Sequence, residues 1–155
     1  MTSESTPHQQ HDTPRSSPVP DRSGSQIDHL NIAIPDLTRA RAFYDPLLAS
    51  IGIQPVLDIP ATATDAAMTG YGWPDTKPFF WLINSGAVGT NMHLAFTVDT
   101  RELVHAFYDT AAGLDAQLLH PPATHLEYHE HYYGAFVLDP HGINIEAVCH
   151  HDQAP

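Results

Sequence analysis

Two stretches of the chain share one pattern, in which alternating apolar and polar residues are followed by apolar residues at helical spacing. The first stretch covers residues 27–45 and the second covers residues 91–109. A shift of 64 positions superimposes them, matching His29 to His93 and the Ala-Phe-Tyr-Asp that ends each stretch. Alternation is typical of a strand, and the longer period is typical of a helix. The fixed self-similarity therefore predicts a duplicated strand–helix unit.

The same patterns predict three further strands after each helix. In the first copy these strands fit residues 53–59, 66–71 and 78–83. In the second copy we expect a strand at 92–98, a helix at 102–112 and strands at 116–119, 133–138 and 143–148. The chain is therefore predicted to be an α+β protein of paired βαβββ modules. We expect one curved mixed eight-stranded sheet with two external helices.

The N-terminal segment differs in composition from the rest of the chain. Residues 1–25 are rich in Ser, Thr and Pro and carry few apolar side chains, so we expect a disordered tail. The folded domain is predicted at residues 26–151, with modules at about 26–85 and 90–150. The tail lacks the apolar centre of a secretory signal, and acidic residues outnumber its two Arg, which indicates a cytoplasmic protein.

The charge balance excludes two classes of partner. The chain has 18 Asp and Glu against 6 Lys and Arg, for a formal net charge of −12. A nucleic acid or an anionic membrane surface is bound by a basic face, so we expect neither as a partner. The apolar runs are far shorter than the ~20 residues of a membrane-spanning helix. The single cysteine, Cys149, excludes an internal disulfide and indicates a reducing compartment.

Histidine is the over-represented residue, with 12 copies in the chain. His29 and His93 occupy equivalent positions of the two copies, so we expect them to face each other across a pseudo-twofold axis. Glu146 lies in an apolar strand, where a carboxylate is costly unless it is paired or bound to a cation. Two His and one carboxylate form a site for Fe(II) or a similar first-row ion. The alternatives are hydrogen-bonded core histidines and a solvent-facing edge carboxylate.

These motifs resemble the vicinal oxygen chelate superfamily, which includes glyoxalase I, fosfomycin and bleomycin resistance proteins and extradiol dioxygenases. The similarity covers residues 26–151 and rests on Ile27-Asp28-His29-Leu30, Arg41-Ala42-Phe43-Tyr44, His93-Leu94-Ala95-Phe96 and Asp139-Pro140-His141-Gly142 leading to Glu146. The resemblance implies paired βαβββ modules, frequent homodimers and a divalent metal in the cleft between modules. It also implies that His29, His93 and Glu146 are the metal ligands.

The chain departs from two members of that superfamily. Glyoxalase I-like members have a fourth ligand, a Glu, but Glu146 shifted back by 64 falls on Leu82, which is flanked by Trp81 and Ile83. The extradiol signature has a Tyr where this chain has Phe136. We therefore expect neither a four-ligand glyoxalase I site nor the complete dioxygenase machinery.

Three functions remain open. The first is a metal-dependent enzyme that acts on a small oxygenated substrate by Lewis-acid and proton-transfer chemistry, as in lyases and isomerases. The metal would be Fe(II), Mn, Ni, Co or Zn. The second is a non-haem Fe(II) extradiol-type dioxygenase, and the third is a non-catalytic small-molecule binding or resistance protein.

A histidine-rich loop is expected next to the proposed site. Residues 121–131 are too long for a tight hairpin turn and precede the strand that neighbours the Glu146 strand. We expect this loop to border the metal cavity, with His131 and Tyr133 as catalytic acid–base groups. The alternative is a solvated loop whose histidines have no catalytic role.

Overall fold

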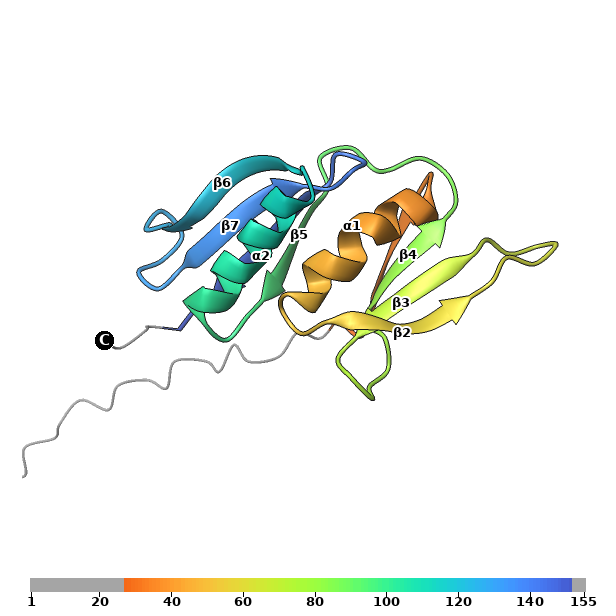
Figure 1. The fold of residues 1–155 in the computed structure, drawn as a ribbon, viewed down its shortest axis with the longest axis horizontal. Helices are drawn as coiled ribbons and strands as arrows, with labels where there is room; N and C mark the ends of the chain where they lie inside the picture. The colour runs from red at the N-terminus through yellow and green to blue at the C-terminus, as the bar shows by residue number, and fades with distance from the viewer. Residues whose placement is uncertain (1–26, 152–155) are drawn as a thin grey trace, which may run out of the picture.

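Each half of the chain folds into a strand, a helix and three more strands, as the computed structural model of residues 27–151 shows (Figure 1). The first module contains β1 (Leu30–Ile34), α1 (Leu37–Ala49), β2 (Gln54–Ile59), β3 (Met68–Gly72) and β4 (Phe80–Asn84). The second contains β5 (His93–Thr97), α2 (Arg101–Gly113), β6 (Gln117–Thr124), β7 (Tyr133–Leu138) and β8 (Asn144–Cys149). The tail predicted at residues 1–25 lies outside the described residues.

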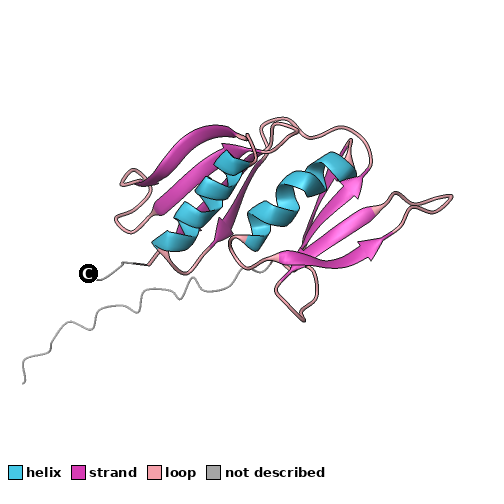
Figure 2. Cartoon of the chain, in the orientation of Figure 1, coloured by secondary structure: helices cyan, strands magenta, loops and turns pink. Residues whose placement is uncertain are grey.

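The α+β class and the paired βαβββ modules are confirmed. The eight strands form two hydrogen-bonded sheets, in the orders β1-β4-β3-β2 and β5-β8-β7-β6, rather than one sheet of eight. The modules meet through side chains instead of strand pairing: the rings of Phe80 on β4 and Phe96 on β5 lie 5.5 Å apart, edge to face. The two helices lie side by side on one face of the strands (Figure 2).

Each helix begins where the sequence supplies an N-cap. The Asp36 side chain accepts a hydrogen bond from the backbone N–H of Arg39 at the start of α1. Thr100 does the same for Leu103 at the start of α2. Both caps satisfy backbone donors that have no partner inside the helix. The predicted helix at 102–112 is confirmed to within one residue at each end.

One predicted boundary is wrong, at the end of β6. This strand continues through Pro121 and Pro122 to Thr124, so part of the expected loop at 121–131 is strand. β6 is an edge strand, and its pairing with β7 shifts register twice, between Leu118 and His120 and between His120 and Ala123. An edge position with bulges is where a sheet tolerates proline.

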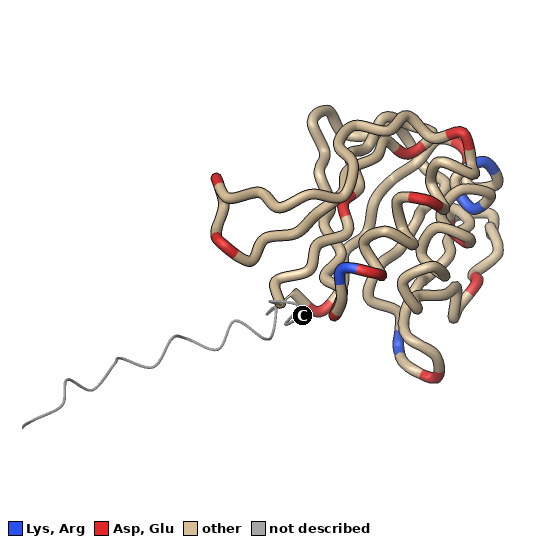
Figure 3. The backbone as a smooth tube through the Cα atoms, turned by 60° about the vertical axis from the view of Figure 1, so that its left-hand side comes forward, with Lys and Arg blue, Asp and Glu red and all other residues tan. Residues whose placement is uncertain are grey.

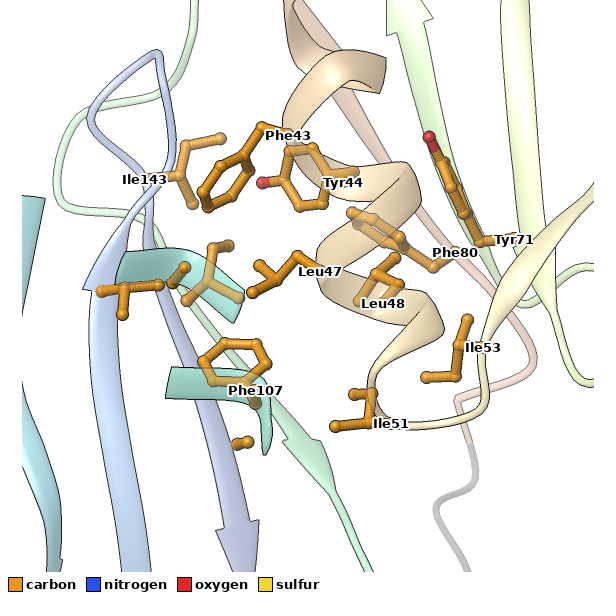
Figure 4. Close-up of a cluster of buried hydrophobic side chains, with 14 of the residues drawn as sticks. Phe43, Tyr44, Leu47, Leu48, Ile51, Ile53, Tyr71, Phe80, Phe107 and Ile143 are labelled. Carbon is orange, nitrogen blue, oxygen red and sulfur yellow. The ribbon is translucent and has the colours of Figure 1, made fainter. Parts of the chain in front are cut away.

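A shared core joins the two modules beneath the helices. Figure 4 shows Phe43, Tyr44 and Leu47 of α1 directed toward Ile143 and Phe107 of the second module. One polar contact crosses the same boundary: the buried Tyr44 hydroxyl donates to Asp139 Oδ2 at 3.0 Å. Asp139 Oδ1 accepts the backbone N–H of Ile143, which fixes the turn that leads into β8.

Candidate functional site

The sheet of the second module places Glu146 on the face that points away from the helices. Its neighbours Ile145 and Ala147 belong to the core, so alternation directs Glu146 to the other face. Glu146 is paired in register with Ala95 on β5 and with Phe136 on β7. His93 is two positions from Ala95 on the same strand and therefore shares this face.

Glu146 is almost fully buried and holds two side-chain partners. The Tyr132 hydroxyl donates to Oε1 at 2.6 Å, and His93 Nε2 lies 3.0 Å from Oε2. Burial raises the pKa of the Glu146 carboxyl, while the contacts with Tyr132 and His93 act in the opposite direction. Burial and the Glu146 contact together raise the pKa of Tyr132, so this hydroxyl stays protonated at neutral pH.

A glycine leaves the space that this carboxylate occupies. A Cβ atom added to Gly134 would lie 2.7 Å from Glu146 Oε1, closer than real side chains approach. In the first module, a Cβ atom added to Gly70 would lie 2.9 Å from the Trp81 ring. Both modules therefore use a glycine to admit a large side chain on the last strand.

The His93–Glu146 pair lies in the wall of a cavity of about 610 Å³. The cavity is lined by side chains of β5 to β8 and of the β6–β7 loop: His93, His120, His125, Glu127, Tyr128, Tyr132, Phe136, Asn144 and Glu146. The Phe136 ring is surrounded by three imidazoles, with centroid distances of 5.9 Å to His93, 5.5 Å to His120 and 5.3 Å to His125.

His125 belongs to a loop that closes on itself through backbone hydrogen bonds. Its backbone N–H donates to the Tyr132 carbonyl at 2.8 Å. Its Nδ1 lies 2.9 Å from Glu127 Oε1. Its Nε2 is buried and has no hydrogen-bond partner among the described residues. The β6–β7 loop borders this cavity, and the loop side chains in its lining are His125, Glu127, Tyr128 and Tyr132.

The structure places the two predicted catalytic residues elsewhere. Tyr133 is the first residue of β7 and points to the face opposite that of Gly134 and Phe136, where its hydroxyl contacts His105 Nε2 of α2 at 2.8 Å. The Arg101 guanidinium lies over its ring at 4.7 Å. His131 lies beside Glu130, 3.1 Å from its carboxylate. Neither lines this cavity, and their catalytic role stays a prediction.

The three predicted metal ligands are brought together only in part. His93 and Glu146 are adjacent, whereas His29 precedes β1 in the other module and does not line the cavity. Its Nδ1 lies 2.9 Å from Asp28 Oδ2, and Asp28 also pairs with Lys77. Along residues 27–151, no three His, Cys, Asp or Glu side chains of one chain are grouped closely enough to hold a metal ion.

Register identifies the residue at the fourth-ligand position of the first module. Asn31 is the equivalent of Ala95, and Asn31 pairs with Trp81 just as Ala95 pairs with Glu146. The equivalent of Glu146 is therefore Trp81 rather than Leu82, because one extra residue separates the strands in the second copy. An indole occupies this position, so the first module offers no carboxylate there.

The second cavity is apolar. It has a volume of about 370 Å³ and lies between the modules, where its wall includes Leu30, Trp73, Phe80 and Phe96. None of the described Lys and Arg residues lines either cavity. Acidic positions outnumber basic ones along the described backbone (Figure 3).

The helices of residues 27–151 lack the length and apolar character needed to cross a membrane. A comparison with curated proteins gave no match.

Solved structures share the fold. A glyoxalase/bleomycin resistance protein from Albidiferax ferrireducens T118 is 24% identical with a TM-score of 0.60, covering 81% of this chain and 98% of that chain. The fosfomycin resistance protein FosX from Listeria monocytogenes is 12% identical with a TM-score of 0.57, covering 81% and 93%. The trypanothione-dependent glyoxalase I of Leishmania major is 20% identical with a TM-score of 0.54, covering 82% and 88%.

Residues 26–147 match the sequence profile of one family, which agrees with the paired modules and with these structural neighbours. The chain therefore belongs to the glyoxalase/bleomycin resistance protein/dioxygenase superfamily.

Proposed function

We propose that this protein is a metal-dependent enzyme that acts on a small oxygenated organic substrate by Lewis-acid and proton-transfer chemistry. The observation that carries the proposal is the His93–Glu146 pair, a carboxylate buried in a cavity wall with an imidazole 3.0 Å away. Two ligands that each lie about 2.1 Å from one ion, at a right angle, are separated by about this distance. Imidazole with carboxylate suits first-row divalent ions.

The third position is assigned to His29 of a second copy of the chain. His29 is half-exposed, and its Nδ1 is engaged by Asp28, so a neutral ring has its Nε2 lone pair free. A carboxylate on the other ring nitrogen is the usual partner of a metal-ligating histidine. The contacts with His29 and then Lys77 lower the pKa of Asp28, which keeps this carboxylate ionised.

A partly exposed apolar sheet face supports a homodimer. Leu57, Gly70 and Trp81 lie side by side on neighbouring strands of the first sheet, in register with Asn31. Leu57 is 45% exposed. Apolar surface of this kind marks an association site. A second copy seated here would bring its own first module over the cavity of this chain, and the converse.

The protein side chains around the site have distinct tasks. A bound divalent ion supplies a Lewis acid that polarises substrate oxygens. Glu146 and His93 would hold that ion, and the Tyr132 hydroxyl donates to one oxygen of the Glu146 carboxylate. Phe136 and Tyr128 of the cavity lining would contact the substrate through their rings.

Metal analysis tests the proposal directly. Untagged protein is stripped with EDTA, reconstituted separately with Fe(II), Mn, Ni, Co and Zn, and assayed for bound metal. We expect one ion per chain, and we expect Glu146→Gln to lose it while the exposed Glu102→Gln on α2 retains it. Stoichiometric iron with oxygen uptake on catechols would assign the dioxygenase alternative instead.

A second candidate is a non-catalytic small-molecule binding protein, which the apolar cavity between the modules favours. Failure to retain any of the five ions, together with binding of an apolar ligand there, would replace the enzyme proposal by this one.

A further inference from the structure

One lateral row of residues crosses the second sheet from its edge strand to the proposed metal position. His120 on β6 pairs in register with Phe136 on β7, and Phe136 pairs in turn with Glu146 on β8. Residues directly opposite each other on neighbouring strands have side chains on the same face. The row therefore places an imidazole on the cavity face, two strands and about 10 Å of backbone away from the buried carboxylate.

The backbone of β6 is irregular on both sides of His120. Its pairing with β7 shifts register between Leu118 and His120 and again between His120 and Ala123. Bulges re-aim side chains and are frequent next to active sites. The His120 ring stands edge to face against the Phe136 ring, with centroids 5.5 Å apart. His120 is exposed and lines the cavity, so a molecule inside the cavity can reach its ring.

His120 differs from the other two imidazoles of the cavity lining. His93 Nε2 faces Glu146 at 3.0 Å. His125 Nδ1 faces Glu127 at 2.9 Å, and the His125 Nε2 atom is buried. No hydrogen bond or ion pair engages the His120 side chain within residues 27–151. Its ring nitrogens are therefore available to take a proton from a bound molecule and to return one.

The remaining titratable groups of the lining are less suited to proton transfer. Burial, followed by the contact with Glu146, raises the pKa of Tyr132, so this hydroxyl keeps its proton at neutral pH. The Glu127 carboxyl has a lowered pKa, caused first by a hydrogen bond to its own backbone N–H and then by His125, so it has no proton to give. The last group is the phenol of Tyr128, and an imidazole is the side chain that both takes and gives a proton near neutral pH.

We infer that His120 is the catalytic proton-transfer residue of the proposed reaction, and that the substrate lies over the Phe136 ring, between His120 and Glu146. The inference rests on the proposed function and adds a residue role to it. In the step, the His120 ring takes the proton from a carbon next to a carbonyl. The electron pair of that C–H bond forms a C=C bond, and the carbonyl π pair moves to oxygen. The imidazolium then returns a proton to carbon.

Hydrogen exchange of a small hydroxyketone measures this step. Hydroxyacetone is incubated in D₂O with the metal-reconstituted full chain, and the loss of its C–H signals is followed by NMR. We expect His120→Gln to slow the exchange by about 100-fold, as for loss of a general acid–base group, while the bound ion is retained. His105→Gln, on α2 and outside the cavity, should exchange as fast as the natural chain.

Two further readouts separate proton transfer from packing. At pH values where the ion stays bound, the exchange rate of the natural chain should fall as the pH is lowered, and His120→Gln should lack this dependence. The second readout uses metal-free protein. Diethyl pyrocarbonate modifies accessible neutral imidazoles, and mass spectrometry of the EDTA-treated full chain should find His120 modified faster than His125.

Exchange at the natural rate in His120→Gln would overturn the inference. A larger loss in His131→Gln, slower modification of His120 than of His125, or no exchange by the metal-loaded natural chain would overturn it as well. In each of these cases a retained ion leaves the proposed function standing. Failure of the natural chain to retain any ion would instead overturn the proposed function, and the inference with it.

Discussion

Gly134 on β7 and Glu146 on β8 share one small volume, since a methyl group on the glycine would lie 2.7 Å from Oε1 of the carboxylate. The glycine is needed here for space, because its backbone lies outside the left-handed region. The position of the proposed metal ligand is therefore set from a neighbouring strand.

Gly134→Ala should displace the Glu146 carboxylate. We expect a loss of stability of about 1–3 kcal/mol, as for other overpacked sites, together with weaker metal binding. Gly113→Ala is the matched control, because a Cβ atom there meets nothing within 4 Å and the position ends α2. The control should be neutral or slightly stabilising by thermal unfolding. Full metal affinity in Gly134→Ala would contradict the packing argument.

Tyr132→Phe should lower the stability of the fold, because it removes a hydrogen bond to the buried Glu146 carboxylate. Burial raises the pKa of this carboxyl in the folded chain above the unfolded value of 4.5. At a pH between these two pKa values, the native chain therefore binds more protons than the unfolded chain. The contribution of Glu146 to stability is thus largest at low pH and is lost as pH rises through that window. The Tyr132 hydroxyl lowers this pKa, and its removal should raise it further.

Urea unfolding of metal-free protein measures the effect. We expect Tyr132→Phe to destabilise by about 1–3 kcal/mol at pH 7 and by less at pH 4, where Glu146 is protonated. Tyr128→Phe, on a side chain that is 61% exposed, should change little at either pH. A loss that is independent of pH would show that the hydroxyl does not act on the carboxylate.

The β6–β7 loop is tied to the end of β8 by two histidines. The His131 backbone N–H donates to His129 Nδ1, so a neutral His129 carries its proton on Nε2 and directs it to His150 Nδ1 at 3.0 Å. Protonation of His150 would remove that acceptor. Burial, then His129 and His151, lowers the His150 pKa below the usual 6.5, so this contact stabilises the fold above pH 6.5 and is lost as pH falls through the folded value.

Hydrogen exchange at the Tyr132 amide, which donates to the His129 carbonyl, measures the state of the loop. Its protection factor should be constant above about pH 6.5 and should fall as the pH drops below that value, because the pKa of His150 in the folded chain is lower than 6.5. His150→Gln should remove most of this pH dependence, and His105→Gln should preserve it. Unchanged protection across the range would mean that the histidine contact does not hold the loop.

The dimer prediction depends on Leu57. A charge placed on the exposed apolar face by Leu57→Glu should convert a homodimer into a monomer by light scattering, since a buried unpaired charge opposes association. Metal binding should weaken in parallel if a second copy supplies His29. Leu118→Glu, at a similarly exposed position on β6, is the control that should remain dimeric. A monomeric natural chain at micromolar concentration would refute the prediction.

The sequence repeat is sufficient to predict the modules and the placement of His93 and Glu146 on one face, because strand parity follows from local alternation. The sequence does not reveal which of Tyr132 and Tyr133 faces the cavity. Both faces of β7 are covered, by α2 on one side and by cavity side chains on the other, so apolar residues occupy every position and alternation gives no signal. The sequence shift of 64 also aligned Glu146 with Leu82 instead of Trp81. The spacing between the paired strands differs by one residue between the two copies, and this difference is visible only in the strand register.

Tyr44 belongs to the first copy of the repeat, but its hydroxyl donates a hydrogen bond to Asp139, in the turn that precedes β8 of the second copy. The two copies are therefore not interchangeable, because the first copy supplies a hydrogen-bond donor to a buried carboxylate of the second. A fragment that starts after the first module would retain His93, Glu146 and the histidine-rich loop, yet it would leave a buried carboxylate short of a donor. Any separation or recombination of the halves must therefore keep α1 together with the β7–β8 turn that contains Asp139.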